Sequence, residues 1–136
     1  MNPILRNILA VIAGWIAGGI ANMALVVAGG MLVPAPAGVN PMDPESIKAS
    51  AHLFEAKHFI FPFIAHSAGT LAGALIASLL GVSRRMVLAL IIGVLFLFGG
   101  VAAALMMPAP AWFVAVDLLI AYIPMALLGW KLSGRS

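Results

Sequence analysis

Charged residues are scarce in this chain of 136 residues, and cysteine is absent. Only 8% of the residues are charged and 64% are hydrophobic, whereas about a quarter of a soluble domain is charged. The mean hydropathy is +1.17. This balance excludes a soluble globular domain and leaves no room for a separate catalytic or nucleic-acid-binding module. The lack of cysteine also excludes disulfides, thiolate metal sites and a cysteine nucleophile.

The apolar residues form four long blocks, which is typical of transmembrane helices and not of barrel strands. Each block is long enough to cross about 30 Å of hydrocarbon at about 1.5 Å per residue. The sequence therefore predicts one all-α domain, an integral membrane bundle of four transmembrane helices. The expected spans are residues 8–33, 58–80, 86–107 and 111–130, with an outer loop at 34–57.

The basic residues are divided unequally between the two sides of these spans. One side holds five of them, and the other holds two together with three acidic residues. By the positive-inside rule, both termini are expected in the cytoplasm and the loop 34–57 outside. The net charge of +3 then reflects membrane orientation and does not indicate nucleic-acid binding. The five basic residues are Arg6, Arg84, Arg85, Lys131 and Arg135.

The outer loop contains a helix start signal. Asp43 is a candidate N-cap, Pro44 suits the first helical position and Glu45 suits the first turn. We expect a short amphipathic helix on the outer surface, helical from Pro44 to about Phe61, with a bend near Pro62 where it enters the second span.

Small residues recur at intervals of four in the first three spans. Such residues let membrane helices approach closely, so these positions are the expected contact faces. They are Gly14, Gly18 and Asn22 in the first span, Gly69, Gly73 and Ala77 in the second, and Ala89 and Gly93 in the third.

Polar residues also occur at the expected depth of the bilayer centre. Asn22, His66 and Asp117 each fall within about 5 Å of that level, on three different spans. A carboxylate at this depth is costly, so Asp117 is expected to face the interior and to contact His66. Thr70 and Tyr122 would extend the set. Two roles stay open: bonding the helices together, or binding a ligand, a proton or an ion.

A second polar motif precedes the second span. His52, Glu55 and His58 are spaced three residues apart, and Glu-x-x-His is a spacing found in di-iron bundles. Such bundles use the motif twice, whereas this chain has it once. The three residues are therefore either a metal site or an ordinary polar rim at the membrane surface. No cofactor is specified by the sequence.

The chain resembles small hypothetical four-span membrane proteins of bacteria. The resemblance is carried by residues 52–74 (HLFEAKHFIFPFIAHSAGTLAGA), by Trp112-Phe113 with Asp117, and by residues 121–125 (AYIPM). It implies a bacterial inner-membrane location and identifies no site residue. The chain departs from drug-resistance transporters of similar size, which carry a Glu in the first helix where this chain has Asn22.

Three functions are compatible with these features. The favoured one is a non-enzymatic protein that binds or translocates a small solute, ion or proton at Asn22, His66, Thr70, Asp117 and Tyr122. The second is an accessory subunit that docks into a larger membrane complex through its small-residue faces. The third is a metal-dependent membrane enzyme using His52, Glu55 and His58 together with His66. Besides the lipid bilayer, the expected partner is a second copy or a larger complex, because four short helices enclose little volume.

Overall fold

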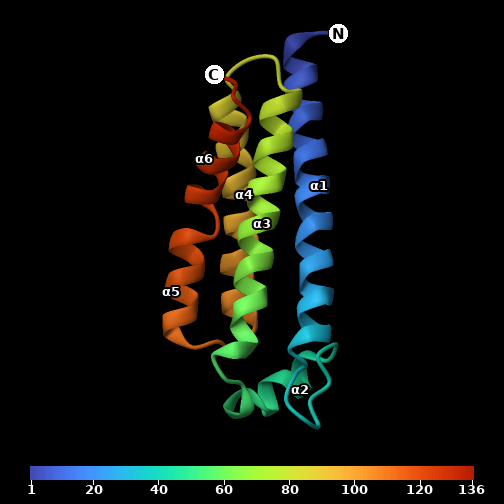
Figure 1. Ribbon diagram of the computed structural model, residues 1–136, viewed down its shortest axis with the longest axis vertical. Coiled ribbons are helices and arrows are strands. Elements are labelled where there is room, and N and C mark those ends of the chain that lie inside the picture. The colour runs from blue at the N-terminus through green and yellow to red at the C-terminus, as the bar shows by residue number, and fades with distance from the viewer.

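The computed structural model describes residues 1–136, and all of its regular secondary structure is helical, without strands. Four long helical segments run side by side, and both chain termini lie at the same end (Figure 1). We call this the terminal end, and we call the opposite end, which carries residues 33–56, the loop end. The elements are α1 (Pro3–Leu32), α2 (Pro44–Ala49), the 3-10 helix η1 (Ala51–Leu53), α3 (Lys57–Leu80), α4 (Arg85–Met106), α5 (Ala111–Ile120) and α6 (Ile123–Leu132).

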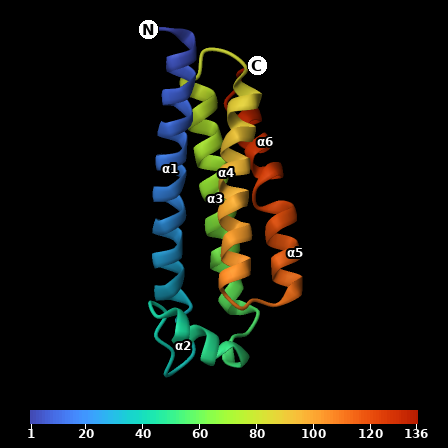
Figure 2. The same ribbon diagram turned by 180° about the vertical axis from the view of Figure 1, so that it is seen from behind.

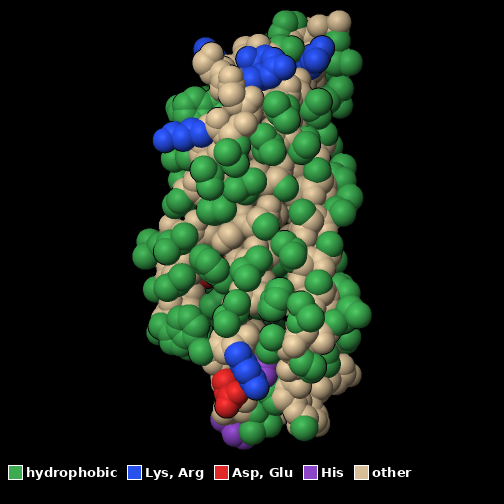
Figure 3. All heavy atoms as spheres, viewed as in Figure 1, with side chains coloured by type: hydrophobic (Ala, Val, Ile, Leu, Met, Phe, Trp, Pro, Cys, Tyr) green, Lys and Arg blue, Asp and Glu red, His purple; other side chains and the backbone are tan.

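The predicted four-helix membrane bundle is confirmed. Four segments are long and apolar enough to cross a membrane: α1, α3, α4 and the pair α5–α6. Their outward side chains are large and hydrophobic, and hydrophobic atoms cover the long middle of the molecule in Figure 3. In the same view basic side chains gather at the terminal end, while acidic and histidine side chains appear at the loop end with a basic side chain beside them. The chain is therefore a small multi-pass membrane protein.

The helices α1 and α3 pack through their small residues. Gly14 lies against Gly73 and Ala77, and Gly18 lies against Gly69. A Cβ added to Gly14 would collide with the backbone carbonyl oxygen of Gly73. These backbones approach so closely because neither helix carries a larger side chain there.

The outer loop differs from its predicted form. Asp43 caps α2 as expected, since its Oδ1 accepts a hydrogen bond of 3.1 Å from the Glu45 amide. However, α2 ends at Ala49, and Phe54 is extended. The expected helix from Pro44 to Phe61 is therefore wrong. The Glu55 amide donates to His58 Nδ1 at 2.8 Å instead of to a helical carbonyl, and a new helix, α3, begins at Lys57.

The fourth span was expected to be one helix and is broken into α5 and α6. The break falls at Ala121 and Tyr122, where the chain forms a turn. Pro124 explains it, because proline has no amide hydrogen and its ring clashes with the carbonyl four residues earlier, that of Ile120. As a result α5 is offset from the axis of α6 (Figure 2).

Candidate functional site

The three polar side chains of α3, α5 and the α5–α6 turn form one hydrogen-bonded group. His66 Nδ1 lies 2.7 Å from Asp117 Oδ1. The Tyr122 hydroxyl donates to Asp117 Oδ2 at 2.8 Å. The predicted contact between His66 and Asp117 is thereby confirmed, and Tyr122 joins it. Asp117 is a buried carboxyl group with a partner on each oxygen.

The local chain explains why this group is held in place. The break before Pro124 positions Tyr122, whose ring stacks on the His66 ring with centroids 5.9 Å apart. Gly100 of α4 makes room for the Tyr122 ring, since any Cβ there would collide with it. The Thr70 hydroxyl donates to the His66 carbonyl at 2.8 Å, so Thr70 binds its own helix and not the carboxylate.

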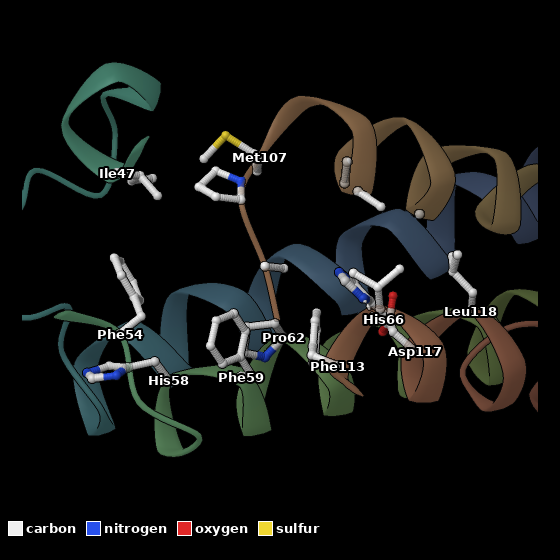
Figure 4. Close-up of a pocket in the computed structure, with 16 residues that line it drawn as sticks. Ile47, Phe54, His58, Phe59, Pro62, His66, Met107, Phe113, Asp117 and Leu118 are labelled. Atoms are coloured by element: carbon white, nitrogen blue, oxygen red, sulfur yellow. Dashed lines mark hydrogen bonds and ion pairs between the residues drawn. The ribbon is translucent and has the colours of Figure 1, made fainter. Parts of the chain in front are cut away.

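A cavity of about 210 Å³ leads from the loop end to this group. Figure 4 shows His66 and Asp117 at one end of it and Ile47 and Phe54 at the other. Most of the remaining lining is apolar, and Phe59 and Phe113 pack together beside it with ring centroids 4.9 Å apart. The lining also includes His58, Pro62, Gly100, Ala103, Ala104, Met107, Pro108, Ala109, Val114 and Leu118.

The ionisation of Asp117 decides which nitrogen of His66 is free. An ionised carboxylate only accepts hydrogen bonds, so beside an ionised Asp117 the hydrogen of this bond belongs to His66 Nδ1. In a neutral imidazole the other nitrogen, Nε2, is then an acceptor. Nε2 makes no hydrogen bond within the chain and is not closed off from its surroundings. The His66 side chain is 25% exposed, whereas that of Asp117 is 6% exposed. His66 is thus the polar group that an occupant of the cavity would meet.

Asn22 does not join this group, although its depth matches. It packs against Gly69 at the interface of α1 and α3, and its side-chain oxygen is buried without a partner. It does not line the cavity. The predicted depth of Asn22 along the bundle therefore matches that of His66. Asn22 nevertheless lies on the side of α3 that faces α1, away from the cavity.

The side chains of His52, Glu55 and His58 do not come together in the structure. Glu55 Oε2 lies 3.4 Å from Lys57 Nζ at an exposed ion pair. His58 Nδ1 is occupied by the Glu55 amide, and no three His, Asp or Glu side chains are grouped as metal ligands would be. His58 and Phe54 instead line the outer part of the cavity.

Two parts of the site escaped sequence reasoning. The first is the helix break beside Asp117, for which Pro124 was the available signal. The second is the wall formed by Phe59 and Phe113, which no spacing rule distinguishes from lipid-facing aromatics.

Comparison with known proteins adds no relative: no family model, no curated protein and no solved structure matches the chain.

Proposed function

We propose that this membrane protein binds a small, mostly apolar solute that carries a hydrogen-bond donor, with His66 Nε2 as its acceptor. The observation that supports this is the cavity of about 210 Å³ whose inner end holds His66 and Asp117. An engineered apolar cavity of about 150 Å³ accepts benzene. A molecule the size of a substituted benzene therefore fits here.

The arrangement also suits a proton. Asp117 holds the imidazole hydrogen on Nδ1, so a proton arriving from the cavity adds to Nε2 and makes an imidazolium beside the carboxylate. The pair then has no net charge, which is favourable where water is scarce. Proton uptake at His66 and donor binding at His66 use the same nitrogen and exclude each other.

Binding can be tested with benzyl alcohol, using toluene as the probe of similar size without a donor. Solid-state nitrogen NMR of histidine-labelled protein in lipid reports the three histidines, and the signals that disappear in His66→Phe are those of His66. We expect benzyl alcohol to shift the His66 Nε2 signal and toluene to leave it unchanged. Equal responses to the two probes would contradict the proposal.

A matched pair of variants locates the site. His66→Phe removes the acceptor, and Ser67→Ala changes the adjacent residue, which does not line the cavity. Benzyl alcohol should raise the unfolding temperature of Ser67→Ala as it does for the unmodified protein. On His66→Phe, benzyl alcohol should raise the unfolding temperature no more than toluene does.

Translocation is the further step of the proposal and has its own measurement. Proteoliposomes are loaded with a pH-sensitive dye and placed under a potassium diffusion potential. The pH inside them should change faster with the unmodified protein than with His66→Phe. Equal rates would restrict the function to binding.

We also propose that the protein lies in a bacterial inner membrane with both termini in the cytoplasm. The five basic residues at the terminal end and the three acidic residues at the loop end support this orientation. Reporter fusions at Ser136 and at Asn40 test it, and activity of a cytoplasm-only reporter at Asn40 would contradict it.

A further inference from the structure

An apolar groove of about 310 Å³ lies between α1 and α4 at the terminal end. Ile4, Ile8 and Ile12 line it from α1, and Leu88 and Ile91 line it from α4. The groove spans residues 4 to 12 of α1, which corresponds to about 12 Å along the helix. The half-thickness of the hydrocarbon layer is about 15 Å. The groove therefore matches the length of one acyl chain in one leaflet.

Arg84 lies next to residues of this groove. It directly precedes α4 with a left-handed backbone (φ 47°), and its carbonyl accepts a hydrogen bond of 3.1 Å from the amide of Leu88, which lines the groove. Its side chain is exposed and makes neither a hydrogen bond nor an ion pair within the chain. The neighbouring arginines differ, since Arg6 Nε donates to the Leu80 carbonyl and Arg85 Nε donates to the Gly81 carbonyl.

The loop that carries Arg84 is fixed to α1 beside the groove. Asn7 Nδ2 donates to Ser83 Oγ at 2.9 Å, and Asn7 Oδ1 accepts from the Val82 amide at 2.9 Å. Asn7 also lines the groove. The backbone that carries Arg84 is thus held beside the apolar groove, and none of the four acidic residues lies at this end.

We propose that this surface binds an anionic phospholipid, with one acyl chain in the groove and the phosphate on Arg84. The guanidinium fork matches a phosphate with two parallel hydrogen bonds. The surplus of positive charge at this end selects a headgroup with net negative charge over a zwitterionic one. This site is at the opposite end of the bundle from the loop-end cavity and does not depend on it.

Trp15 provides a reporter, because it lies one helical turn beyond Val11 of the groove and is half exposed. The variant Trp112→Phe/Trp130→Phe leaves Trp15 as the sole tryptophan. It is reconstituted into vesicles of phosphatidylcholine and phosphatidylglycerol in which one lipid at a time carries brominated chains. Stronger quenching by the brominated phosphatidylglycerol, relative to its share of the bilayer, measures preferential binding.

We expect a preference for phosphatidylglycerol that falls about fivefold with Arg84→Gln, the effect of one lost surface charge. Arg84→Lys should retain most of it. The matched control is Arg135→Gln, which removes an exposed basic residue at the same end, outside the groove. High salt should lower the preference of the reporter protein without any charge substitution.

Three results would overturn the proposal. One is equal quenching by both brominated lipids in the reporter protein. Another is an equal loss of the preference for phosphatidylglycerol in Arg84→Gln and Arg135→Gln, which would show that any basic residue at this end has the same effect. The third is protection of Trp15 from both lipids that grows with protein concentration, which would place a second copy of the chain in the groove.

Discussion

The two faces of α3 are built in opposite ways. Toward α1, Gly69 and Gly73 bring the backbones into direct contact, and no space remains for a side chain. Toward α5, the same helix presents His66 to an open cavity. A polar residue of a neighbouring helix contacts each face: Asn22 of α1 is enclosed against Gly69, whereas Asp117 of α5 is hydrogen-bonded through both oxygens.

One face of α3 therefore packs against its neighbour, while the other carries the polar group beside the cavity. The closed face fixes the position of α3, so the open face does not have to be filled to hold the bundle together. A cavity beside α5 is tolerated because α1 and α6 already pack closely against α3. Substitutions on the two faces should therefore fail in different ways.

The largest expected effect is on the closed face. Gly14→Leu places a side chain where even a Cβ collides with the Gly73 carbonyl, so α1 and α3 must separate. We expect a loss of about 3 kcal/mol of unfolding free energy, measured by denaturant unfolding in mixed micelles. Gly19→Leu is the control, because nothing lies within 4 Å of a Cβ at Gly19. Equal stability of the two variants would refute the close packing.

On the open face, His66→Leu leaves the Asp117 carboxylate with only Tyr122 as its partner. Losing a hydrogen bond to a buried charged group costs about 2 kcal/mol, and the same unfolding measurement should register it. The double variant His66→Leu/Asp117→Leu removes both groups and should be more stable than His66→Leu alone. If the double variant is the less stable one, His66 and Asp117 contribute to the stability of the bundle by more than satisfying each other's hydrogen bonds.

Tyr122→Phe should have a smaller effect, because it removes one hydrogen-bond donor and keeps the ring stacked on His66. We expect a loss of about 1 kcal/mol. The nitrogen NMR signal of His66 Nε2 should stay unchanged, since the bond between His66 Nδ1 and Asp117 remains. A change of that nitrogen NMR signal in Tyr122→Phe would show that the tyrosine, and not Asp117 alone, controls the tautomer.

The smallest effect is expected for Asn22→Ala. The Asn22 side-chain oxygen is buried without a partner, so its removal should change stability by no more than about 0.5 kcal/mol. Benzyl alcohol should still stabilise this variant, because Asn22 does not line the cavity. Loss of that stabilisation in Asn22→Ala would show that Asn22 contributes to the binding site.

The sequence predicted the features that depend on position along one helix. Block length and composition gave the four spans, and equal depth predicted the contact of His66 with Asp117. Equal depth failed to place Asn22, because direction around a helix depends on which helices are neighbours. The break at Tyr122 was also missed, since membrane helices often tolerate proline without breaking. The binding role of these residues stays a prediction.

The break at Tyr122 also divides the fourth span into segments of unequal local stability. α6 packs closely against both α3 and α4, whereas α5 touches these two helices at few places. Segments with few buried contacts open at low free-energy cost. Amide hydrogens of α5 should therefore exchange with solvent deuterium sooner than those of α6. A molecule seated in the cavity would add contacts to Phe113 and slow that exchange, which makes α5 the part of the chain that records occupancy.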